Sequence, residues 1–509
     1  MGIKILLLVL FFAVMVAVGF YARRHAYSVD GFVLGGRSVG PWLTAFAYGT
    51  SYFSAVVFVG YAGQFGWKYG LASTWIGIGN ALIGSLLAWV VLGRRTKVMT
   101  QHLNVKTMPD FFGERYESKP LKLVASAIVF IFLVPYTASV YNGLSRLFGM
   151  AFDIPYTYCV LGMAVFTAVY VILGGYMATA INDFIQGIIM LGGIIAVIGA
   201  VLSGQGGFIN AIRKMAEIPS DVPITMGQPG AFTSFFGPDP LNLLGVVILT
   251  SLGTWGLPQM IGKFYAIKDE KSINTGTVIS TIFAIVISGG CYFLGGFGRL
   301  FDNKAIYDET GNVVFDSIVP YMLSTLPDIL IGIVIVLVLS ASMSTLASLV
   351  LTSSSTLTLD FLKDNVLKNA NDKKLVRWMQ VLIVFFIVLS VAIALDPPTF
   401  IAQLMGISWG ALAGAFLAPF LYGLYWKRVT KAAVWASFIA GVGITVSNMF
   451  IGYIASPINA GAIAMVAGLV IVPIVSVLSP KPDTSKVESI FACYDEKVTI
   501  TKKRSLEAK

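Results

Sequence analysis

Charged residues are scarce in this sequence. Asp, Glu, Lys and Arg together make up 12% of the 509 residues, whereas they make up about 25% of a typical soluble protein. Hydrophobic residues make up 57%, and apolar stretches long enough to cross a bilayer recur along most of the chain. The scarcity of charge therefore argues against a soluble globular protein and predicts an all-α, polytopic membrane protein embedded in the lipid bilayer.

Cysteine and histidine are also rare. The three cysteines, Cys159, Cys291 and Cys493, lie far apart without a C-x-x-C pair, so they predict neither a disulfide framework nor a metal centre. The two histidines, His25 and His102, fall in expected loops, which argues against a histidine proton relay inside the membrane. The expected spans also show no nucleophile–base pair, and we therefore predict that the protein is not an enzyme.

Acidic residues are nearly absent from the expected spans. Asp183 is the one carboxylate that falls clearly inside a span. A buried charge in a membrane is costly and usually functional. Asp183 also falls near the start of its expected helix, where an acid stabilises the helix N-terminus, so both interpretations stay open. The scarcity of carboxylates argues against a carboxylate-driven proton pump. It leaves hydroxyl and carbonyl oxygens, a ligand set suited to sodium, for any bound cation.

Thirteen apolar segments are predicted to span the membrane. Most of the 35 Lys and Arg residues fall in alternate loops, including a basic loop at 263–271, so the positive-inside rule predicts an external N-terminus and a cytoplasmic C-terminus. Because the bases are dispersed among loops, no nucleic-acid binding is expected. The predicted spans are 4–22, 41–66, 72–93, 123–148, 156–174, 181–203, 241–262, 274–298, 329–358, 376–395, 399–425, 431–453 and 457–478.

These spans form one transmembrane domain. Residues 1–480 are predicted to make up this domain in a multi-pass protein of the plasma membrane, and 481–509 a short cytoplasmic tail. No obligate protein partner is evident from the sequence.

Two spans carry helix-breaking or small residues near their middle. In 41–66, the glycine and hydroxyl residues at 49–54 allow the helix to unwind, although a continuous helix packed on a neighbour explains them equally well. In 241–262, two glycines, at 253 and 256, precede the helix-breaking Pro258, and unwinding is favoured. Counted from the second span, these are the first and sixth of ten helices. Paired breaks of this kind predict an inverted-repeat transporter with its site at the bilayer midplane.

A stripe of small and hydroxyl side chains runs along span 329–358. Ala341, Ser344, Thr345 and Ser348 are spaced so that they share one face of a helix. Hydroxyls on one face can bind a cation, but they also let two helices pack closely. Considered alone, the stripe favours helix packing.

Three stretches of the sequence resemble the sodium:solute symporter family, within about residues 30–430. They are SASMSTLASLVLTSSSTLTLD at 340–360, GGYMATAINDFIQG at 174–187 and GLPQMIGKFYAIKDEKS at 256–272. The resemblance implies a LeuT-type core of five plus five helices in an inverted repeat, at about 41–425, within the thirteen transmembrane helices. It also implies sodium-coupled import of a small organic solute by alternating access.

The resemblance assigns residues to a sodium site. Its ligands would be the carbonyls of Thr50, Phe53 and Ala341 and the hydroxyls of Ser344 and Thr345. Five neutral oxygens suit a monovalent cation, because a divalent ion normally recruits carboxylates.

Some members of this family bind a second sodium ion. Its ligands are an aspartate that matches Asp183 and hydroxyls that match Ala347 and Ser348. Because residue 347 is alanine here, we expect one sodium ion per cycle. Asp183 would then be a stop on the exit path, and Ser348 the remnant of a second site.

The substrate is less well defined by the sequence. Proline carriers of the family have an aromatic pair where this chain has Thr250 and Thr254, so we rank proline below pantothenate and monocarboxylates. A carboxylate-bearing solute is expected because half-helix N-termini attract anions. A sugar or other neutral solute, a transporter-fold sensor and a passive channel are the alternatives. The expected substrate contacts are Ser51, Ser54, Tyr141, Asn142, Trp255 and Gln259, of which only Ser54 matches a family position.

Overall fold

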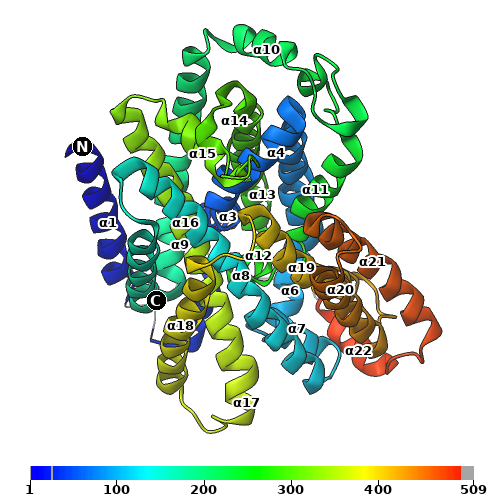
Figure 1. The fold of residues 1–509 in the computed structure, drawn as a ribbon. Helices are drawn as coiled ribbons and strands as arrows, with labels where there is room; N and C mark the ends of the chain where they lie inside the picture. Colours follow the sequence, from blue (N-terminus) through cyan, green and yellow to red (C-terminus); the bar gives the residue numbers. More distant parts are fainter. Residues whose placement is uncertain (1, 24–26, 495–509) are drawn as a thin grey trace, which may run out of the picture.

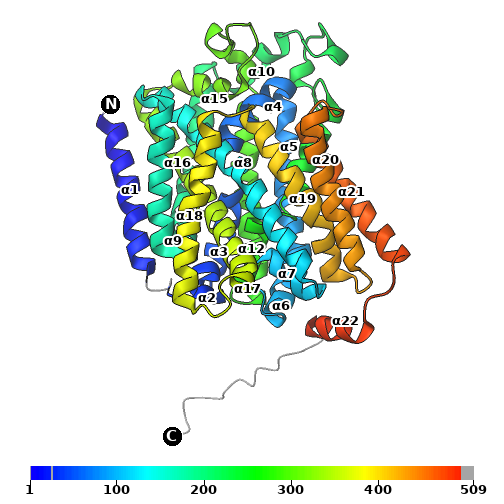
Figure 2. The same ribbon diagram turned by 60° about the horizontal axis from the view of Figure 1, so that its bottom comes forward.

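The computed structural model describes residues 2–23 and 27–494, and this part of the chain folds as a bundle of helices (Figure 1). Apart from two isolated β-bridges, the described residues contain no strand. The long helices stand side by side, with α10 and α15 at one end and α2, α7, α17 and α22 at the other (Figure 2). The predicted all-α fold is therefore confirmed.

The bundle is built from long helices and from π-helical turns (η) that interrupt them. In chain order these elements are α1 (Gly2–Ala22), α3 (Pro41–Tyr52), η3 (Val56–Tyr61), α4 (Ala62–Tyr69), α5 (Thr74–Gly79), η5 (Asn80–Leu87), η6 (Trp89–Gly93), α6 (Arg94–His102), α8 (Lys119–Phe152), α9 (Tyr156–Gly204), α11 (Pro240–Gly253), α12 (Pro258–Ala266), α13 (Glu270–Ala284), η9 (Ile285–Gly289), α14 (Gly290–Gly295), α16 (Asp328–Thr356), η12 (Leu357–Leu362), α18 (Asp372–Leu395), α19 (Ile401–Tyr425), α20 (Lys431–Ile451) and α21 (Pro457–Leu478).

Shorter helices and 3-10 turns connect these elements or cover the ends of the bundle. They are α2 (Val29–Leu34), η2 (Gly35–Arg37), η4 (Gly70–Ser73), α7 (Met108–Arg115), α10 (Phe208–Glu217), η7 (Pro223–Thr225), η8 (Ala231–Thr233), η10 (Gly298–Phe301), η11 (Lys304–Ile306), α15 (Phe315–Ser324), α17 (Lys363–Asn365), α22 (Thr484–Phe491) and η13 (Ala492–Tyr494).

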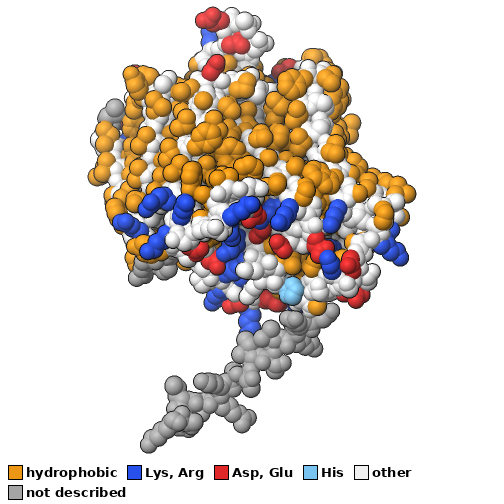
Figure 3. Space-filling model, turned by 90° about the horizontal axis from the view of Figure 1, so that it is seen from below, with side chains coloured by type: hydrophobic (Ala, Val, Ile, Leu, Met, Phe, Trp, Pro, Cys, Tyr) orange, Lys and Arg blue, Asp and Glu red, His pale blue; other side chains and the backbone are white. Residues whose placement is uncertain are grey.

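The surface of the bundle matches a membrane environment. On the face seen in Figure 3, hydrophobic side chains cover a broad band, and Lys and Arg side chains gather below this band, toward the end that carries α22. Within the described residues, 11 helices are long and apolar enough to cross a membrane. The protein is therefore a multi-pass membrane protein.

The count of thirteen spans is not confirmed by these 11 helices. Part of the difference lies in α9, which has 49 residues and runs through two predicted spans. Gly175 lies between those spans with φ 54° and ψ −151°, outside the helical region. A Cβ atom at Gly175 would lie 2.8 Å from the ring of Phe32, so only glycine fits there. Gly175 divides α9 into two arms, each long enough to cross a bilayer.

The predicted interruption of span 41–66 is present. α3 ends at Tyr52 and helical backbone resumes at Ala55, directly before η3, so residues 53 and 54 form a first break, in which Phe53 is extended with φ −101° and ψ 102°. Ala55 N–H donates to Ser342 Oγ of α16 at 3.2 Å, and Val56 N–H donates to Ser54 Oγ at 3.2 Å. The alternative of a continuous helix is therefore wrong. The interruption is tolerated because side chains accept hydrogen bonds from the backbone N–H groups that the break frees.

The predicted interruption of span 241–262 is also present. α11 ends at Gly253 and α12 begins at Pro258, so residues 254–257 form a second break. Pro258 takes the first position of α12, where a missing N–H costs nothing. A Cβ atom at Gly256 would lie 2.7 Å from the Cα of Ala413 in α19. Glycine therefore lets the break pack directly against a neighbouring backbone.

Helix α16 lies at the centre of the molecule. It packs against α3, α8, α9 and α18, and every residue from 337 to 351 is buried. The hydroxyl stripe of α16 therefore lies entirely inside the protein, where its oxygens need partners.

Candidate functional site

The stripe on α16 faces the end of α3. Ser344 Oγ lies 3.0 Å from the Thr50 carbonyl oxygen, and Thr345 Oγ1 lies 3.1 Å from the same atom. The two hydroxyls lie 3.0 and 3.1 Å from the carbonyl oxygen of Ala341. Each hydroxyl has one proton to donate to either carbonyl. We call these four converging oxygens the sodium cage, after the ion that the sequence predicts there.

The first break explains why the Thr50 carbonyl is available. In a continuous helix this carbonyl would accept the N–H of residue 54, but α3 ends at Tyr52. The hydroxyl of Thr50 bonds back to the Phe46 carbonyl at 2.8 Å, so the carbonyl alone faces α16. Four of the five predicted sodium ligands thus lie together. The fifth, Phe53, lies in the first break, and the role of all five residues as sodium ligands stays a prediction.

The chemistry of the cage fits a monovalent cation. Its oxygens are neutral and fully buried, and both hydroxyl side chains are 0% exposed. A calcium or magnesium site would normally include carboxylates. Among the residues that the structure describes, no group of three or more His, Cys, Asp or Glu side chains is placed to hold a metal ion.

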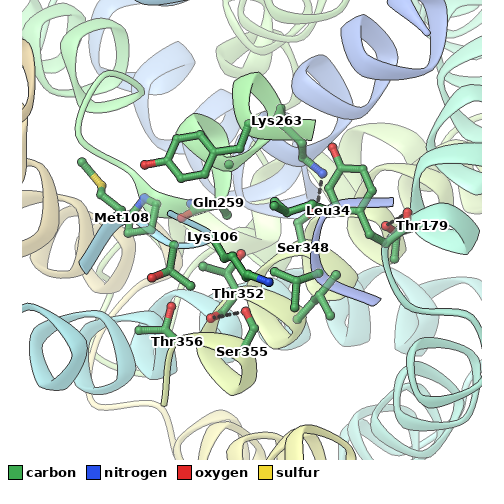
Figure 4. Close-up of a pocket in the computed structure, with 17 residues that line it drawn as sticks. Leu34, Lys106, Met108, Thr179, Gln259, Lys263, Ser348, Thr352, Ser355 and Thr356 are labelled. Carbon is green, nitrogen blue, oxygen red and sulfur yellow. Dashed lines mark hydrogen bonds between the residues drawn. The ribbon is translucent and has the colours of Figure 1, made fainter. Parts of the chain in front are cut away.

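One helical turn further along α16, Ser348 contacts a buried ammonium group (Figure 4). Lys263 Nζ donates to Ser348 Oγ at 3.0 Å and lies 3.8 Å from Asp183 Oδ2. The oxygens of Ser348 and Ser51 lie 2.7 Å apart, and the Tyr176 ring centroid lies 5.1 Å from Lys263 Nζ. The Lys263 and Asp183 side chains are 3% and 0% exposed. We call Asp183, Lys263, Ser348 and Ser51 the lysine cluster.

Lys263 corrects the sequence analysis, which placed it in a basic loop at 263–271. It lies in α12, because the helix resumes at Pro258 directly after the second break and continues to Ala266. A signal was present in the sequence, since Lys263 follows the predicted break by less than two helical turns. Assigning bases to loops by the positive-inside rule concealed it.

Asp183 does not cap a helix. It lies about two turns beyond Gly175, well inside the second arm of α9, whereas a capping residue lies at the first turn. Its carboxylate instead forms the ion pair with Lys263. The helix-capping alternative is therefore wrong, and the role of Asp183 on an ion path stays a prediction.

A second buried carboxylate, Asp360 in η12, was not anticipated. Asp360 is 1% exposed, and its Oδ2 accepts the Thr107 hydroxyl at 2.6 Å. Lys122 Nζ lies 3.8 Å from Asp360, 2.9 Å from Asp110 and 3.0 Å from Asp364. This network joins η12, α7 and α8 at the end of the bundle opposite α10. Asp360 was overlooked because it falls at the edge of the predicted span.

The pocket of Figure 4 lies beside the lysine cluster. Residues of α2, α9, α12 and α16 and of the segment before α7 line it, including Lys106, Gln259, Lys263, Ser348 and Thr352. Of the six predicted substrate contacts, only Gln259 lines this pocket. Its side-chain amide is buried and has no hydrogen-bond partner among the described residues. Gln259 therefore has the unmet bonding capacity expected of a ligand contact.

The other predicted substrate contacts are dispersed. Ser51 belongs to the lysine cluster and Ser54 lies in the first break. Trp255 donates from Nε1 to the Ile83 carbonyl at 2.9 Å. Asn142 accepts from Arg146 at 2.9 Å, and the Tyr141 hydroxyl is buried without a hydrogen-bond partner among the described residues. The six residues do not line one pocket.

An aromatic cluster lies against the second break, and the sequence analysis missed it. The Trp409 ring of α19 stacks on Tyr52 at 5.5 Å and meets Tyr136 edge-on at 5.8 Å. A Cβ atom on Gly253, the last residue of α11, would lie 2.6 Å from the Trp409 ring. Trp409 Nε1 and the Tyr136 hydroxyl are buried without partners among the described residues. Apolar surface with a few unmet polar groups is typical of a ligand site.

Comparisons with known proteins agree with the arrangement of broken helices and buried oxygens. The model of the sodium:solute symporter family matches residues 32–441. The osmoregulated proline transporter OpuE of Bacillus subtilis is 28% identical over 498 residues, which cover 95% of this chain and 96% of the relative. The sodium/proline symporter of Salmonella typhimurium is 28% identical over 440 residues, which cover 84% of each protein.

Solved structures share the fold. A Na+-coupled sialic acid symporter superposes with a TM-score of 0.77 at 16% identity, covering 94% of this chain and 98% of the other. The nucleobase-cation-symport-1 transporter MHP1 superposes with a TM-score of 0.51 at 12% identity, covering 90% and 98%. These relatives and structural neighbours are transporters, not enzymes.

Proposed function

The chain belongs to the sodium:solute symporter family, and on that premise we propose that one sodium ion, bound in the cage between α3 and α16, drives uptake of a small carboxylate-bearing solute by alternating access. Family membership makes the protein a sodium-coupled symporter of the plasma membrane. The ion's ligands, the solute and the orientation in the membrane are the parts that we propose.

The sodium site is supported most by the hydroxyls of Ser344 and Thr345, which both bond to the Thr50 carbonyl. Two hydroxyls aimed at one carbonyl at the end of a broken helix form a ready-made set of neutral oxygens. A sodium ion there would accept lone pairs from all of them, and the hydroxyl protons would turn away. We propose Thr50, Phe53, Ala341, Ser344 and Thr345 as the ligands.

Sodium at this position would link a broken helix to a continuous one. The ion would favour the conformation in which α3 and α16 lie close, because it binds that conformation more tightly. If the same conformation forms the solute site, sodium raises the affinity for solute, and solute raises the affinity for sodium by the same factor. This reciprocity is the thermodynamic basis that we propose for coupling.

A carboxylate-bearing solute is supported by groups around the second break. α12 begins at Pro258 without a side-chain cap, so the positive end of its dipole can attract an anion. Gln259, at the next position, offers an amide with no partner among the described residues. Tyr136 and Trp409 provide apolar surface with unpaired donors. We propose these three side chains as solute contacts.

Proline is the first solute to test. The sequence analysis ranked proline behind pantothenate and monocarboxylates because of Thr250 and Thr254. The relatives are named as proline transporters and do not support that ranking. The rings of Tyr52 and Trp409 supply aromatic surface at the second break in place of those positions. Pantothenate and short monocarboxylates remain candidates because they share the carboxylate.

We propose that the N-terminus lies outside the cell and the C-terminus in the cytoplasm. α1 begins at the end of the bundle that carries α10, while α22 lies at the opposite end (Figure 2). Lys and Arg side chains gather toward the α22 end (Figure 3), and cytoplasmic loops are enriched in these residues.

Uptake into proteoliposomes tests the proposed function. Purified protein would be reconstituted with an inward sodium gradient and offered radiolabelled proline, pantothenate, a short monocarboxylate or a sugar in separate trials. We expect accumulation of proline or another carboxylate above its external concentration, and its loss when a sodium ionophore collapses the gradient. Uptake that only equilibrates, with or without sodium, would indicate a passive channel instead.

A further inference from the structure

The lysine cluster has the composition of a cation site that already contains a cation. Asp183 provides a carboxylate, and Ser348 and Ser51 provide hydroxyl oxygens 2.7 Å apart. Such oxygens, buried together, would otherwise bind a metal cation. Lys263 Nζ lies among them, 3.0 Å from Ser348 Oγ and 3.8 Å from Asp183 Oδ2.

We propose that the ammonium group of Lys263 is a built-in cation, which fills the site formed by Asp183, Ser348 and Ser51 and excludes a second sodium ion. This proposal rests on sodium coupling at the cage, and it specifies why the stoichiometry is one sodium ion per cycle.

Charge balance is the main physical reason. Asp183 and Lys263 are both buried, with side chains 0% and 3% exposed, and together they are neutral. A sodium ion added to the cluster would place two positive charges beside one carboxylate, in surroundings where charges repel more strongly than in water. Sodium can therefore enter only if the ammonium group leaves or is removed.

Hydrogen-bond geometry gives a second reason. The Ser51 hydroxyl donates to the Ala47 carbonyl at 2.6 Å, which leaves its oxygen free to accept the Ser348 proton. The Ser348 oxygen in turn accepts from Lys263. The hydrogen bonds form a single chain that runs from Lys263 through Ser348 and Ser51 to the backbone of α3. Each hydroxyl oxygen that a sodium ion would need therefore already accepts a hydrogen bond.

The position of the cluster relates it to the sodium cage. Ser348 lies one turn from Ser344 on α16, and Ser51 follows Thr50 on α3. The Lys263 ammonium group thus bonds to α16 one helical turn beyond the cage. The built-in cation occupies its site in every molecule, whereas the cage depends on the sodium concentration.

Equilibrium binding of radiolabelled sodium to the purified, full-length protein tests the proposal without knowledge of the solute. We expect one saturable sodium ion per wild-type protein and two per Lys263→Met protein. In Lys263→Met, the additional ion should be lost when Asp183→Asn is introduced. Lys263→Arg retains a positive charge and should bind one ion. Lys268→Met is the matched control, because Lys268 is exposed, and it should also bind one.

Two results would overturn the proposal. The first is a wild-type protein that binds two sodium ions, one of which is lost in Asp183→Asn. The second is a Lys263→Met protein that folds and binds no more sodium ions than the wild-type protein. If Lys263→Met does not fold, Ser344→Ala decides, because it damages the cage and leaves Lys263 in place. We then expect sodium binding that is about tenfold or more weaker and does not depend on Asp183, and a remaining ion that depends on Asp183 would contradict the proposal.

The same experiment separates this proposal from the proposed function. A wild-type protein that binds no sodium, together with a Lys263→Met protein that binds one Asp183-dependent ion, would support the built-in cation and contradict sodium binding in the cage.

Discussion

The sodium cage and the lysine cluster use neighbouring turns of the same face of α16, yet they bind charge in opposite ways. In the cage, Ser344 and Thr345 direct their protons toward the carbonyl oxygens of Thr50 and Ala341. In the cluster, Ser348 accepts a hydrogen bond from an ammonium group that belongs to the protein. One site can accept a mobile cation, and we propose that the other contains a permanent one.

The difference comes from the neighbouring helices and not from the stripe itself. Ser344 and Ser348 are the same residue type, one turn apart, and both are buried. Ser344 faces the end of α3, where the first break frees the Thr50 carbonyl. Ser348 faces α12, where the second break brings Lys263 into the membrane interior. The chemistry of a hydroxyl on a buried stripe is therefore determined by which helix break it meets.

The largest expected effect is on stability, from removing the charge that balances Lys263. Asp183→Asn leaves the ammonium group buried without its carboxylate, and breaking a buried pair in this way costs about 3–5 kcal/mol. The thermal unfolding temperature of the purified protein should fall strongly. Glu117→Gln, which disrupts an exposed pair with Lys486, is the control and should cost about 0–1 kcal/mol. Equal unfolding temperatures for the two variants would contradict a paired, buried Lys263.

The next effect is on sodium dependence. Ser344→Ala or Thr345→Ala removes one oxygen from the cage, and the loss of one buried partner costs about 1–3 kcal/mol. The sodium concentration for half-maximal uptake should therefore rise by about tenfold or more, while expression changes little. Ser355→Ala is the matched control, since Ser355 lies on the same helix and bonds only to the Thr352 carbonyl. Unchanged sodium titrations for both cage variants would contradict the assignment of Ser344 and Thr345 as sodium ligands.

A third variant compares the two regions directly. Ser348→Ala removes an acceptor of Lys263 but no ligand of the cage, so it should lower stability by about 1–3 kcal/mol. Its half-maximal sodium concentration should stay within about threefold of the wild-type value, less than 1 kcal/mol. Parallel melting curves and sodium titrations measure both quantities. If Ser348→Ala shifted the sodium titration as far as Ser344→Ala does, the two regions would form a single site.

The smallest expected effect is that of Thr345→Ser, which keeps the hydroxyl and removes a methyl group. The half-maximal sodium concentration should change by about twofold or less. A sodium titration beside Thr345→Ala measures the difference, and a loss as large as that of the alanine variant would show that packing, and not the oxygen, matters at this position.

The positions of the cage residues have local signals in the sequence, but their role as ligands was implied only by the family resemblance. The spacing of Ala341, Ser344, Thr345 and Ser348 gives their shared face, which considered alone favoured helix packing, and the glycine and hydroxyl residues before Phe53 allow the first break. The second break was also predicted, from Pro258 and the two glycines that precede it.

The lysine cluster and the aromatic cluster could not be predicted in the same way. The environment of Lys263 depends on where α12 begins and on which arm of α9 lies beside it, and these are tertiary facts. Asp183 looked like a helix cap because the bend at Gly175 moved the start of its helix arm. The contact of Trp409 with Tyr52 joins residues on distant helices, and no periodic pattern identifies such a pair.

Sodium entry that depends on solute tests the central claim most directly. Proteoliposomes would be loaded without sodium and offered radiolabelled sodium in the presence or absence of proline, or of whichever carboxylate the uptake screen identifies. The account predicts that solute stimulates sodium entry in the wild-type protein and that, at the wild-type half-maximal sodium concentration, this stimulation is about fivefold or more weaker in Ser344→Ala. Solute entry without any accompanying sodium, or equal sodium entry into Ser344→Ala and wild-type vesicles, would contradict it.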